Sequence, residues 1–238
     1  MKVINHFSPN FDKKNRPIDF IKILVIHYTG MQSERESIVR LSDPKFKVSS
    51  HFVIGQNGRV YRLVEENKVA WHAGKSCWGK YKNLNKNSIG IELVNKGHQF
   101  GYTSFKKRQI SSLIKLCKTL IKKYKIKSIV GHSDIAPLRK KDPGEKFPWE
   151  KLAKKKIGFW HSYKPKELIK FRRVRILKKS KFEFIKSLDK IGYCFEVKNK
   201  SNFTKTIKAF QMRFRKKLVN GIIDKECLLI AQNLSKKI

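Results

Sequence analysis

Residues 22–30, KILVIHYTG, contain an uninterrupted apolar run that ends at His27, and such a run predicts a buried β-strand. SIGIELVN at residues 88–95 and KSIVGH at residues 127–132 have the same character. Between these two runs, residues 104–125 carry apolar side chains at helical spacing, which predicts one long amphipathic helix. Strands that alternate with helices predict an α/β fold with a central mixed β-sheet flanked by helices.

The segments between the predicted strands also carry local signals. Ser33 followed by Glu36 predicts a capping box at the start of a short helix. Two β-rich runs within residues 49–64 flank the triplet QNG at 56–58, which predicts a hairpin. A loop rich in Pro and Gly follows the third strand, and Trp149 is expected to begin a closing helix.

The last third of the chain differs in character from the rest. Three short, basic segments with helical periodicity are separated by Gly- and Asn-containing breaks, and they span residues 180–190, 203–216 and 224–236. We therefore predict two domains, a larger one at residues 1–162 and a small three-helix domain at residues 163–238.

The composition is strongly basic. The chain has 56 Lys and Arg residues against 18 Asp and Glu, a formal net charge of +38. Such a charge favours nonspecific affinity for polyanions, but a coding bias towards A and T would equally enrich Lys, Ile, Asn and Phe. No known nucleic-acid-binding motif accompanies the charge, so we expect no specific nucleic-acid partner. Hydrophobic residues make up 40% of the chain, enough for a packed core, which argues against global disorder.

The N-terminus and the cysteines bear on the cellular compartment. Residues 1–17 contain no apolar stretch of signal-peptide length, and no transmembrane segment follows. We therefore expect a cytoplasmic protein, with the periplasm or cell envelope as the alternative. The four cysteines form no CxxC pair, and Cys117 and Cys227 lie in apolar helical segments, so free thiols are expected. A monomer is the default expectation.

Two histidines and one aspartate form a candidate metal site. His27 and His132 each stand at the end of a predicted buried strand, and Asp142 lies in the loop that follows His132. Two imidazoles and a carboxylate suit one catalytic Zn2+ and leave a fourth position for water. From spacing alone the alternative stays open, because a histidine at a strand end is more often a hydrogen-bonded structural residue.

Five local sequences occur in one characteristic order: VIHYTG, SSHFVIGQNGRVYRLV, AWHAGKS, NSIGIELVN and GHSDIAPLRKKDPGEKFPW. This order resembles that of zinc-dependent N-acetylmuramoyl-L-alanine amidases, which share their fold with peptidoglycan recognition proteins. The resemblance covers residues 20–160 and is most specific at GHSDIAP and KDPG. It implies peptidoglycan or muropeptide substrates, cut between N-acetylmuramic (or anhydro-N-acetylmuramic) acid and L-alanine of the stem peptide, in cell-wall turnover or recycling.

The resemblance also implies a role for individual residues. The metal ligands are matched by His27, His132 and Asp142, the catalytic carboxylate by Glu92 and the catalytic lysine by Lys140. Glu92 would accept a proton from the attacking water and deliver it to the departing alanine nitrogen, and Lys140 would stabilise the developing oxyanion.

Ser50 stands where several relatives carry a catalytic tyrosine, so proton transfer is expected of the carboxylate, as in the AmiD/AmpD-like branch. Aromatic, imidazole and amide side chains near a cleft suit sugar faces and peptide amides. We expect substrate contacts from four such residues, namely His51, His72, Trp78 and Asn87. For His51 a structural packing role is the alternative.

The C-terminal sequences SLDKIGYCFEV, TIKAFQMRF and NGIID resemble a small three-helix peptidoglycan-binding domain. Gly192 is expected to cap a helix, and Phe210 and Leu229 to lie in the core of the bundle. This appendage implies action on both intact and anhydro-muramoyl ends. Deletion of the chain after residue 165 is accordingly expected to weaken action on polymeric wall more than on soluble muropeptides.

Two other functions compete with the amidase. A non-catalytic peptidoglycan recognition module would have lost a metal ligand, whereas this chain keeps the whole expected set. A basic nucleic-acid-binding protein is supported by charge alone.

Overall fold

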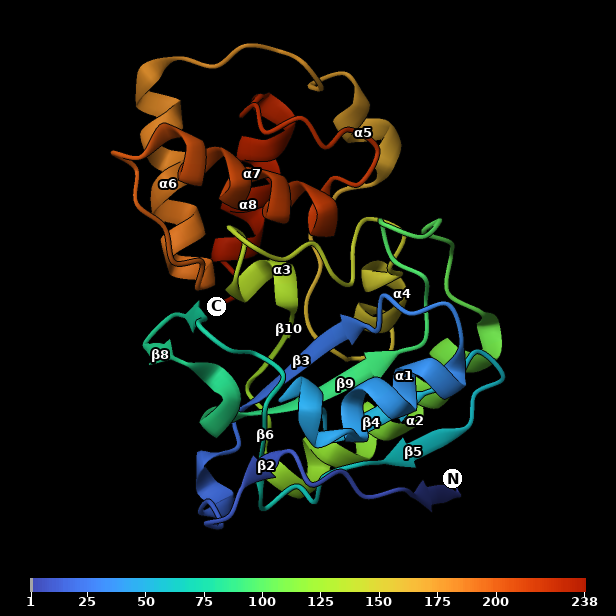
Figure 1. Ribbon diagram of the computed structural model, residues 1–238. Helices are drawn as coiled ribbons and strands as arrows, with labels where there is room; N and C mark the ends of the chain where they lie inside the picture. The colour runs from blue at the N-terminus through green and yellow to red at the C-terminus, as the bar shows by residue number, and fades with distance from the viewer. Residues whose placement is uncertain (1) are drawn as a thin grey trace.

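A six-stranded mixed sheet lies at the centre of the computed structural model, which describes residues 2–238 (Figure 1). Its order is β1-β5-β4-β9-β3-β10. The strands span Val3–Asn5 (β1), Ile23–Tyr28 (β3), Phe52–Ile54 (β4), Val60–Arg62 (β5), Ser88–Leu93 (β9) and Ser128–Gly131 (β10). β4, β9, β3 and β10 run parallel, whereas β4 and β5 form the predicted antiparallel hairpin. The predicted mixed sheet is confirmed.

Four helices belong to this part of the chain: α1 (Glu34–Ser42), α2 (Lys107–Tyr124), α3 (His132–Ile135) and α4 (Trp149–Ala153). The hydroxyl of Ser33 accepts a hydrogen bond from the backbone N–H of Glu36, so α1 begins where the sequence predicts. The long helix α2 buries Leu113, Cys117 and Leu120 against the sheet. The short helix α3 differs from the prediction, because the sequence predicts a loop after His132.

The two faces of the sheet have different neighbours. On β3, Leu24 and Ile26 pack in the same apolar cluster as α2, whereas Val25 belongs to a cluster on the opposite side. Side chains alternate along a strand, so His27 shares the face of Val25. Glu92 on β9 is paired directly with His27 in the parallel register. Both polar side chains therefore lie on the face that α2 leaves uncovered.

Four strands of two residues each were not predicted: β2 (Phe11–Asp12), β6 (Val69–Ala70), β7 (Cys77–Trp78) and β8 (Tyr81–Lys82). They form two antiparallel pairs, β2 with β6 and β7 with β8. Three 3-10 helices also occur in the connections, at Ile18–Phe20 (η1), Pro44–Phe46 (η2) and Leu84–Asn87 (η3). Elements this short are set by tertiary contacts, and no periodic pattern in the sequence marks them.

The C-terminal unit, residues 163–238, contains α5 (Pro165–Ile169), α6 (Lys178–Ile191), α7 (Lys200–Phe214) and α8 (Lys225–Ser235). The three predicted helices are confirmed, and α5 is additional. Gly192 ends α6 in the left-handed region at φ 118°, and its N–H bonds the carbonyls of Leu188 and Asp189. In Figure 1 these helices lie together at the top of the view, next to α3.

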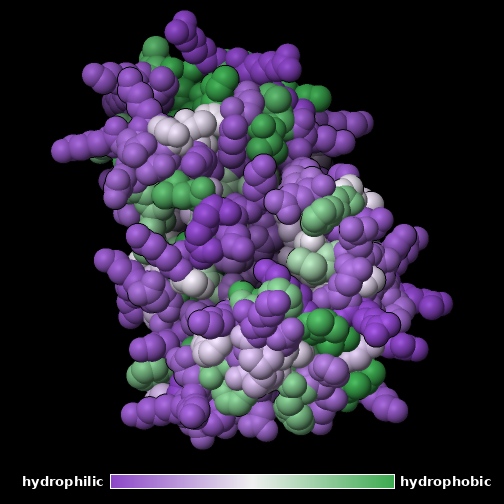
Figure 2. Space-filling view, viewed as in Figure 1, coloured by the Kyte–Doolittle hydropathy of each residue, from purple (hydrophilic) through white to green (hydrophobic). Residues whose placement is uncertain are grey.

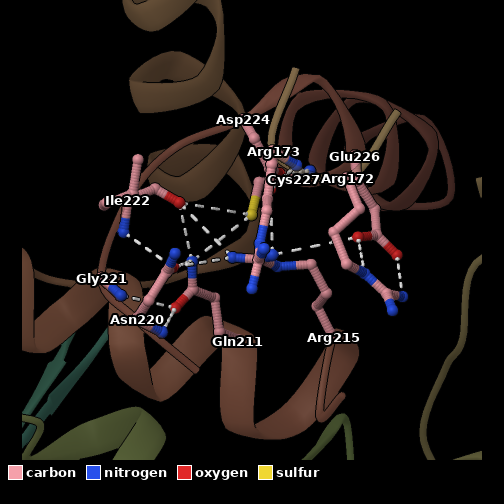
Figure 3. A network of polar contacts seen from close by, with 10 residues as sticks. All are labelled: Arg172, Arg173, Gln211, Arg215, Asn220, Gly221, Ile222, Asp224, Glu226 and Cys227. Atoms are coloured by element: carbon pink, nitrogen blue, oxygen red, sulfur yellow. Dashed lines mark hydrogen bonds and ion pairs between the residues drawn. The ribbon is translucent and has the colours of Figure 1, made fainter. Parts of the chain in front are cut away.

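A polar network fixes the connection between α7 and α8 (Figure 3). The side-chain oxygen of Gln211 accepts hydrogen bonds from the N–H groups of Asn220 and Gly221. Arg215 and Asp224 form an ion pair at 2.9 Å, and both side chains are almost fully buried. The AFQMRF and NGIID sequences therefore have a structural role here, because they build this turn.

The C-terminal unit shares an apolar cluster with the sheet. Val25 and Val130 from the sheet, and Trp78 from β7, pack in the same cluster as Tyr193 and Phe210. The predicted boundary between residues 162 and 163 thus lies between segments with a common core. That boundary stays a prediction.

A disulfide adds a covalent link between the same two parts. Cys77 in β7 is bonded to Cys194, 117 residues later in the chain. The expectation of free thiols is wrong for this pair, because nothing in the spacing reveals that β7 and the end of α6 are neighbours. Cys117 and Cys227 are free and buried, as expected.

The surface agrees with the basic composition. Figure 2 shows hydrophilic residues over most of the viewed face, with apolar residues in small, separate patches. Within residues 2–238 no helix is both long and apolar enough to cross a membrane.

Arg16 offers a test of the fold, because it is a buried cation bonded mainly to backbone carbonyls. It donates to the carbonyls of Glu66 and Ser88 and contacts the ring of His51 at 2.9 Å. Lysine cannot reproduce the flat, branched guanidinium, so carbonyls would be left unpaired. We expect Arg16→Lys to lower the free energy of unfolding by about 2–3 kcal/mol in urea titrations. The exposed Arg35→Lys is the control, and an equal midpoint for both variants would contradict this account.

Candidate metal centre and active site

Three buried side chains converge at the end of the sheet. The Nδ1 atom of His27 lies 2.9 Å from Nδ1 of His132 and 3.0 Å from Oδ2 of Asp142. The Asp142 oxygen lies 3.1 Å from Nδ1 of His132. His27 is presented by β3, His132 by the first residue of α3, and Asp142 by the loop that precedes α4. The structure thus brings together the three ligands predicted from the sequence.

The ionisation of this cluster fits metal binding. Burial, with a further contribution from His132, lowers the pKa of His27 to about 4, so its imidazole is neutral at physiological pH. Burial alone would raise the pKa of Asp142, but the charge and hydrogen bonding of His132 and His27 outweigh it and hold that pKa well below its usual range. A neutral imidazole and a carboxylate are the forms in which these side chains bind a divalent metal.

The outward nitrogen of His27 is held by a chain of hydrogen bonds. Its Nε2 lies 3.1 Å from Nδ1 of His72, and Nε2 of His72 lies 3.2 Å from the hydroxyl of Ser88. Ser88 donates in turn to the carbonyl of Leu84. If His27 and His72 both carry the proton on Nε2, every donor in this chain has an acceptor. This tautomer leaves Nδ1 of His27 free for a metal.

His132 is oriented by a comparable contact, because its Nε2 lies 3.2 Å from the carbonyl of Ala73. Arg139 donates to the same carbonyl.

His72 packs directly against the sheet, and the missing side chain of Gly90 leaves room for its ring. A Cβ on Gly90 would lie 2.5 Å from Cγ of His72.

A cavity of about 440 Å³ opens beside the metal cluster, and Glu92 and Lys140 line it. The Oε2 atom of Glu92 is buried and has no hydrogen-bond partner in the described part of the chain. Burial, and secondly the charge of Asp142, raise the pKa of Glu92 to about 8. Lys140 lowers the pKa of both Glu92 and His27, so its charge acts on both sides of the site. A carboxylate so placed can accept and release a proton near neutral pH.

The four predicted substrate contacts have different positions. His72 lines the cavity, as expected, although both of its ring nitrogens are engaged within the protein. His51 is fully buried, where it contacts Arg16 and accepts from the N–H of Gly90.

Trp78 packs against Tyr193 of the C-terminal unit, with 5.0 Å between ring centroids. The side chain of Asn87 bonds the carbonyl of Phe20. Neither residue lines the cavity, and His51 does not line it either. The polar or aromatic groups of these three residues are engaged in internal contacts, and their predicted role in substrate binding stays a prediction.

Other cavity residues were not predicted as substrate contacts. The hydroxyl of Tyr28 lies 2.9 Å from Nδ1 of His98, and Nε2 of His98 lies 3.1 Å from Oε2 of Glu145. Arg139 lines the cavity as well. The position of Tyr28 next to His27 was available as a signal. For His98 the sequence offered no such signal, because its loop is distant from the metal ligands in the sequence and reaches the cavity only in the folded chain.

Comparison with known proteins agrees with this geometry. The profile of the N-acetylmuramoyl-L-alanine amidase family matches residues 14–145. The chain belongs to this amidase family. The amidase AmiD of Escherichia coli is 39% identical over 234 residues, which cover 91% of this chain and 83% of AmiD. The amidase AmpD of Haemophilus influenzae is 38% identical, over 60% of this chain and 86% of AmpD.

Two solved structures match nearly the whole chain. E. coli AmiD in complex with anhydro-N-acetylmuramic acid-L-Ala-D-γ-Glu-L-Lys superposes with a TM-score of 0.81 at 36% identity and covers 95% of this chain and 92% of that one. AmpDh3 from Pseudomonas aeruginosa gives a TM-score of 0.80 at 30% identity, with 94% of each chain covered. The resemblance to the AmiD/AmpD-like branch is thereby confirmed, and it includes the C-terminal helices.

The hydrogen-bond chain behind His27 can be tested by His72→Phe. Phenylalanine fills a similar space but cannot accept from Nε2 of His27, so this ligand loses its fixed orientation. We expect the dissociation constant for Zn2+, measured by chelator competition, to rise about tenfold or more. His98→Phe removes a cavity imidazole that contacts no ligand, and it should bind Zn2+ as the wild type does. Equal affinity of the His72 variant and the wild type would contradict the assigned role.

Proposed function

We propose that this amidase hydrolyses the amide bond between muramic acid, intact or anhydro, and L-alanine of the stem peptide, with one Zn2+ at His27, His132 and Asp142. The observation that carries the proposal is the adjacency of this ligand cluster to Glu92, whose carboxylate oxygen lacks a partner. Membership of the family and the muropeptide bound to the similar AmiD support the choice of substrate.

The donor set supports zinc as the metal. Two imidazoles and one carboxylate match the three-ligand pattern of catalytic zinc sites, which keep one position open. Zn2+ bound there would polarise the scissile carbonyl and lower the pKa of a bound water to near 7. The remaining steps belong to the protein.

Glu92 would move the proton in this reaction. An amide nitrogen is a poor leaving group unless it is protonated, so one group has to take a proton from the attacking water and deliver it to nitrogen. Glu92 lines the cavity beside the ligands, and burial raises its pKa to about 8, near enough to neutral pH for the carboxyl group to take up and release a proton. Ser50 is fully buried and cannot share this work.

Lys140 would stabilise the negative charge that develops on the carbonyl oxygen. Its backbone N–H bonds the carbonyl of Ala136, which anchors the residue to the end of α3. A cation held beside a developing oxyanion stabilises the transition state, by about 3 kcal/mol where bound substrate displaces the water. Lys96, Arg139 and Lys141 also line the cavity. Their charges suit the carboxylates of a stem peptide.

The C-terminal unit, proposed as a peptidoglycan-binding domain at residues 163–238, needs a revised expectation for its deletion. Its core is continuous with that of the sheet, and the Cys77–Cys194 bond joins the two parts. Removal would expose Val25, Val130 and Trp78 to water. We therefore now expect deletion to impair action on soluble muropeptides and on polymeric wall alike.

The disulfide also favours the cell envelope over the cytoplasm as the place of action. Disulfides persist in oxidising compartments and are rare where thiols are kept reduced.

We expect the denatured, unreduced protein to react with two equivalents of a thiol reagent, at Cys117 and Cys227, and with four after reduction. Four reactive thiols before reduction, in protein purified from an oxidising compartment, would contradict the pairing.

The role of Glu92 can be tested with Glu92→Gln. Glutamine keeps the shape of the side chain but cannot hold or transfer the proton, so turnover of an anhydro-muropeptide should fall about a thousandfold. Zinc content, measured by atomic emission, should stay at one equivalent because Glu92 is not a ligand. A variant that retains turnover would refute the assignment, and one that loses zinc would make Glu92 part of the metal site.

A further inference from the structure

Asp134 lies two residues after the metal ligand His132, in the four-residue helix α3. Only 1% of the residue is exposed. Its Oδ2 atom accepts a hydrogen bond of 2.8 Å from the N–H of Gly131, the last residue of β10. Asp134 therefore spans the junction between strand and helix at which His132 is presented.

Both carboxylate oxygens of Asp134 are also bonded by the C-terminal unit. The hydroxyl of Tyr193, just after α6, donates to Oδ1 at 2.7 Å. Arg213 of α7 donates from Nη1 to Oδ2 at 2.6 Å and from Nη2 to the carbonyl of Ile129 on β10 at 2.9 Å. Tyr193 and Arg213 are each 2% exposed. Arg213 thus contacts both the strand before His132 and the helix that begins with it.

The position of Tyr193 is itself fixed by contacts with β7 and with Gly79, the residue that follows this strand. Its ring packs against Trp78, and the N–H of Gly79 donates to the carbonyl of Gly192 at 2.7 Å. The Cys77–Cys194 bond holds the same two segments together. The hydroxyl therefore reaches Asp134 from a backbone that has little freedom to move.

A single turn of helix is not stable in isolation, because fixing its residues costs more than its few hydrogen bonds return. The geometry of α3 consequently depends on contacts from outside, and the polar contacts from Tyr193 and Arg213 meet at Asp134. Buried charge-assisted hydrogen bonds of this kind are strong and directional. They would hold the imidazole of His132 at its angle towards His27 and Asp142.

We propose that Tyr193 and Arg213 are positioning residues for the metal ligand His132. The C-terminal unit then completes the metal centre, in addition to any contact it makes with the wall. This inference rests on the proposed metal site at His27, His132 and Asp142. It predicts that loss of either contact weakens metal binding even where the protein remains folded.

The test compares the wild type with Tyr193→Phe and Arg213→Lys in the full-length protein. Tyr193→Phe removes one hydroxyl and keeps the ring packing, whereas Arg213→Lys keeps the charge but cannot bond Asp134 and Ile129 together. The dissociation constant for Zn2+ is measured by competition with a chromogenic chelator, and the visible spectrum of the Co2+ form reports ligand geometry. Each variant should bind Zn2+ about tenfold more weakly and show an altered Co2+ spectrum.

Arg215→Lys is the matched control. Arg215 directly follows α7, is similarly buried and pairs with Asp224 at 2.9 Å (Figure 3). Its side-chain hydrogen bonds go to Asp224, Asn220 and Ile222, and none goes to Asp134. This variant should lower the thermal unfolding midpoint and leave the Zn2+ constant and the Co2+ spectrum unchanged.

Wild-type metal binding and an unaltered Co2+ spectrum in Tyr193→Phe would overturn the inference, and this variant decides alone if Arg213→Lys does not fold. Equal weakening by Arg215→Lys would overturn it too, because the effect would then be general destabilisation. If wild-type protein binds no Zn2+, or if His27→Ala binds it as tightly as the wild type, the metal centre itself is wrong and this inference fails with it.

Discussion

The parallel pairing of β9, β3 and β10 is the constraint on which the rest of the molecule depends. It sets Glu92 directly opposite His27 and ends β10 beside β3, so that His132 emerges next to His27. Because side chains alternate along each strand, these groups share the face that α2 does not cover. A shift of one residue in either pairing would turn a ligand or the carboxylate into the core beneath α2.

Such an arrangement gathers polar groups in a place with little water, and the surrounding sequence satisfies them. His72, Ser88 and the carbonyls of Leu84 and Ala73 orient the two imidazoles. Arg16 donates in the same way to the carbonyl of Ser88, the first residue of β9. Glu92 differs from the two imidazoles, since its buried Oε2 atom has no partner within residues 2–238. An unsatisfied carboxylate beside three prepared ligands is costly for stability and useful for proton transfer.

Much of this fold could be predicted, and the reasons for the failures are physical. The buried strands around His27 and Glu92 and the helix at 104–125 follow from local periodicity, and the three ligands follow from the order of their motifs. The disulfide at Cys77 could not be predicted in that way, and the sequence left open whether His51 lines the cleft or is packed in the interior. Both depend on which distant segments meet, and the same is true of the hydrogen bonds that Tyr193 and Arg213 donate to Asp134. A motif shows which residues recur together, but contacts decide whether a histidine faces the cavity or the core.

A zinc-loaded site of this kind should cut one particular amide of a muropeptide. Mass spectrometry of the products from a defined anhydro-muropeptide, incubated with the protein and one equivalent of Zn2+, identifies the bond that is cut. Two products are expected, a sugar without its peptide and a stem peptide with a free L-alanine amine, and their masses should sum to substrate plus one water. Cleavage at any other bond, or an intact substrate in the presence of metal-loaded protein, would contradict the proposed activity.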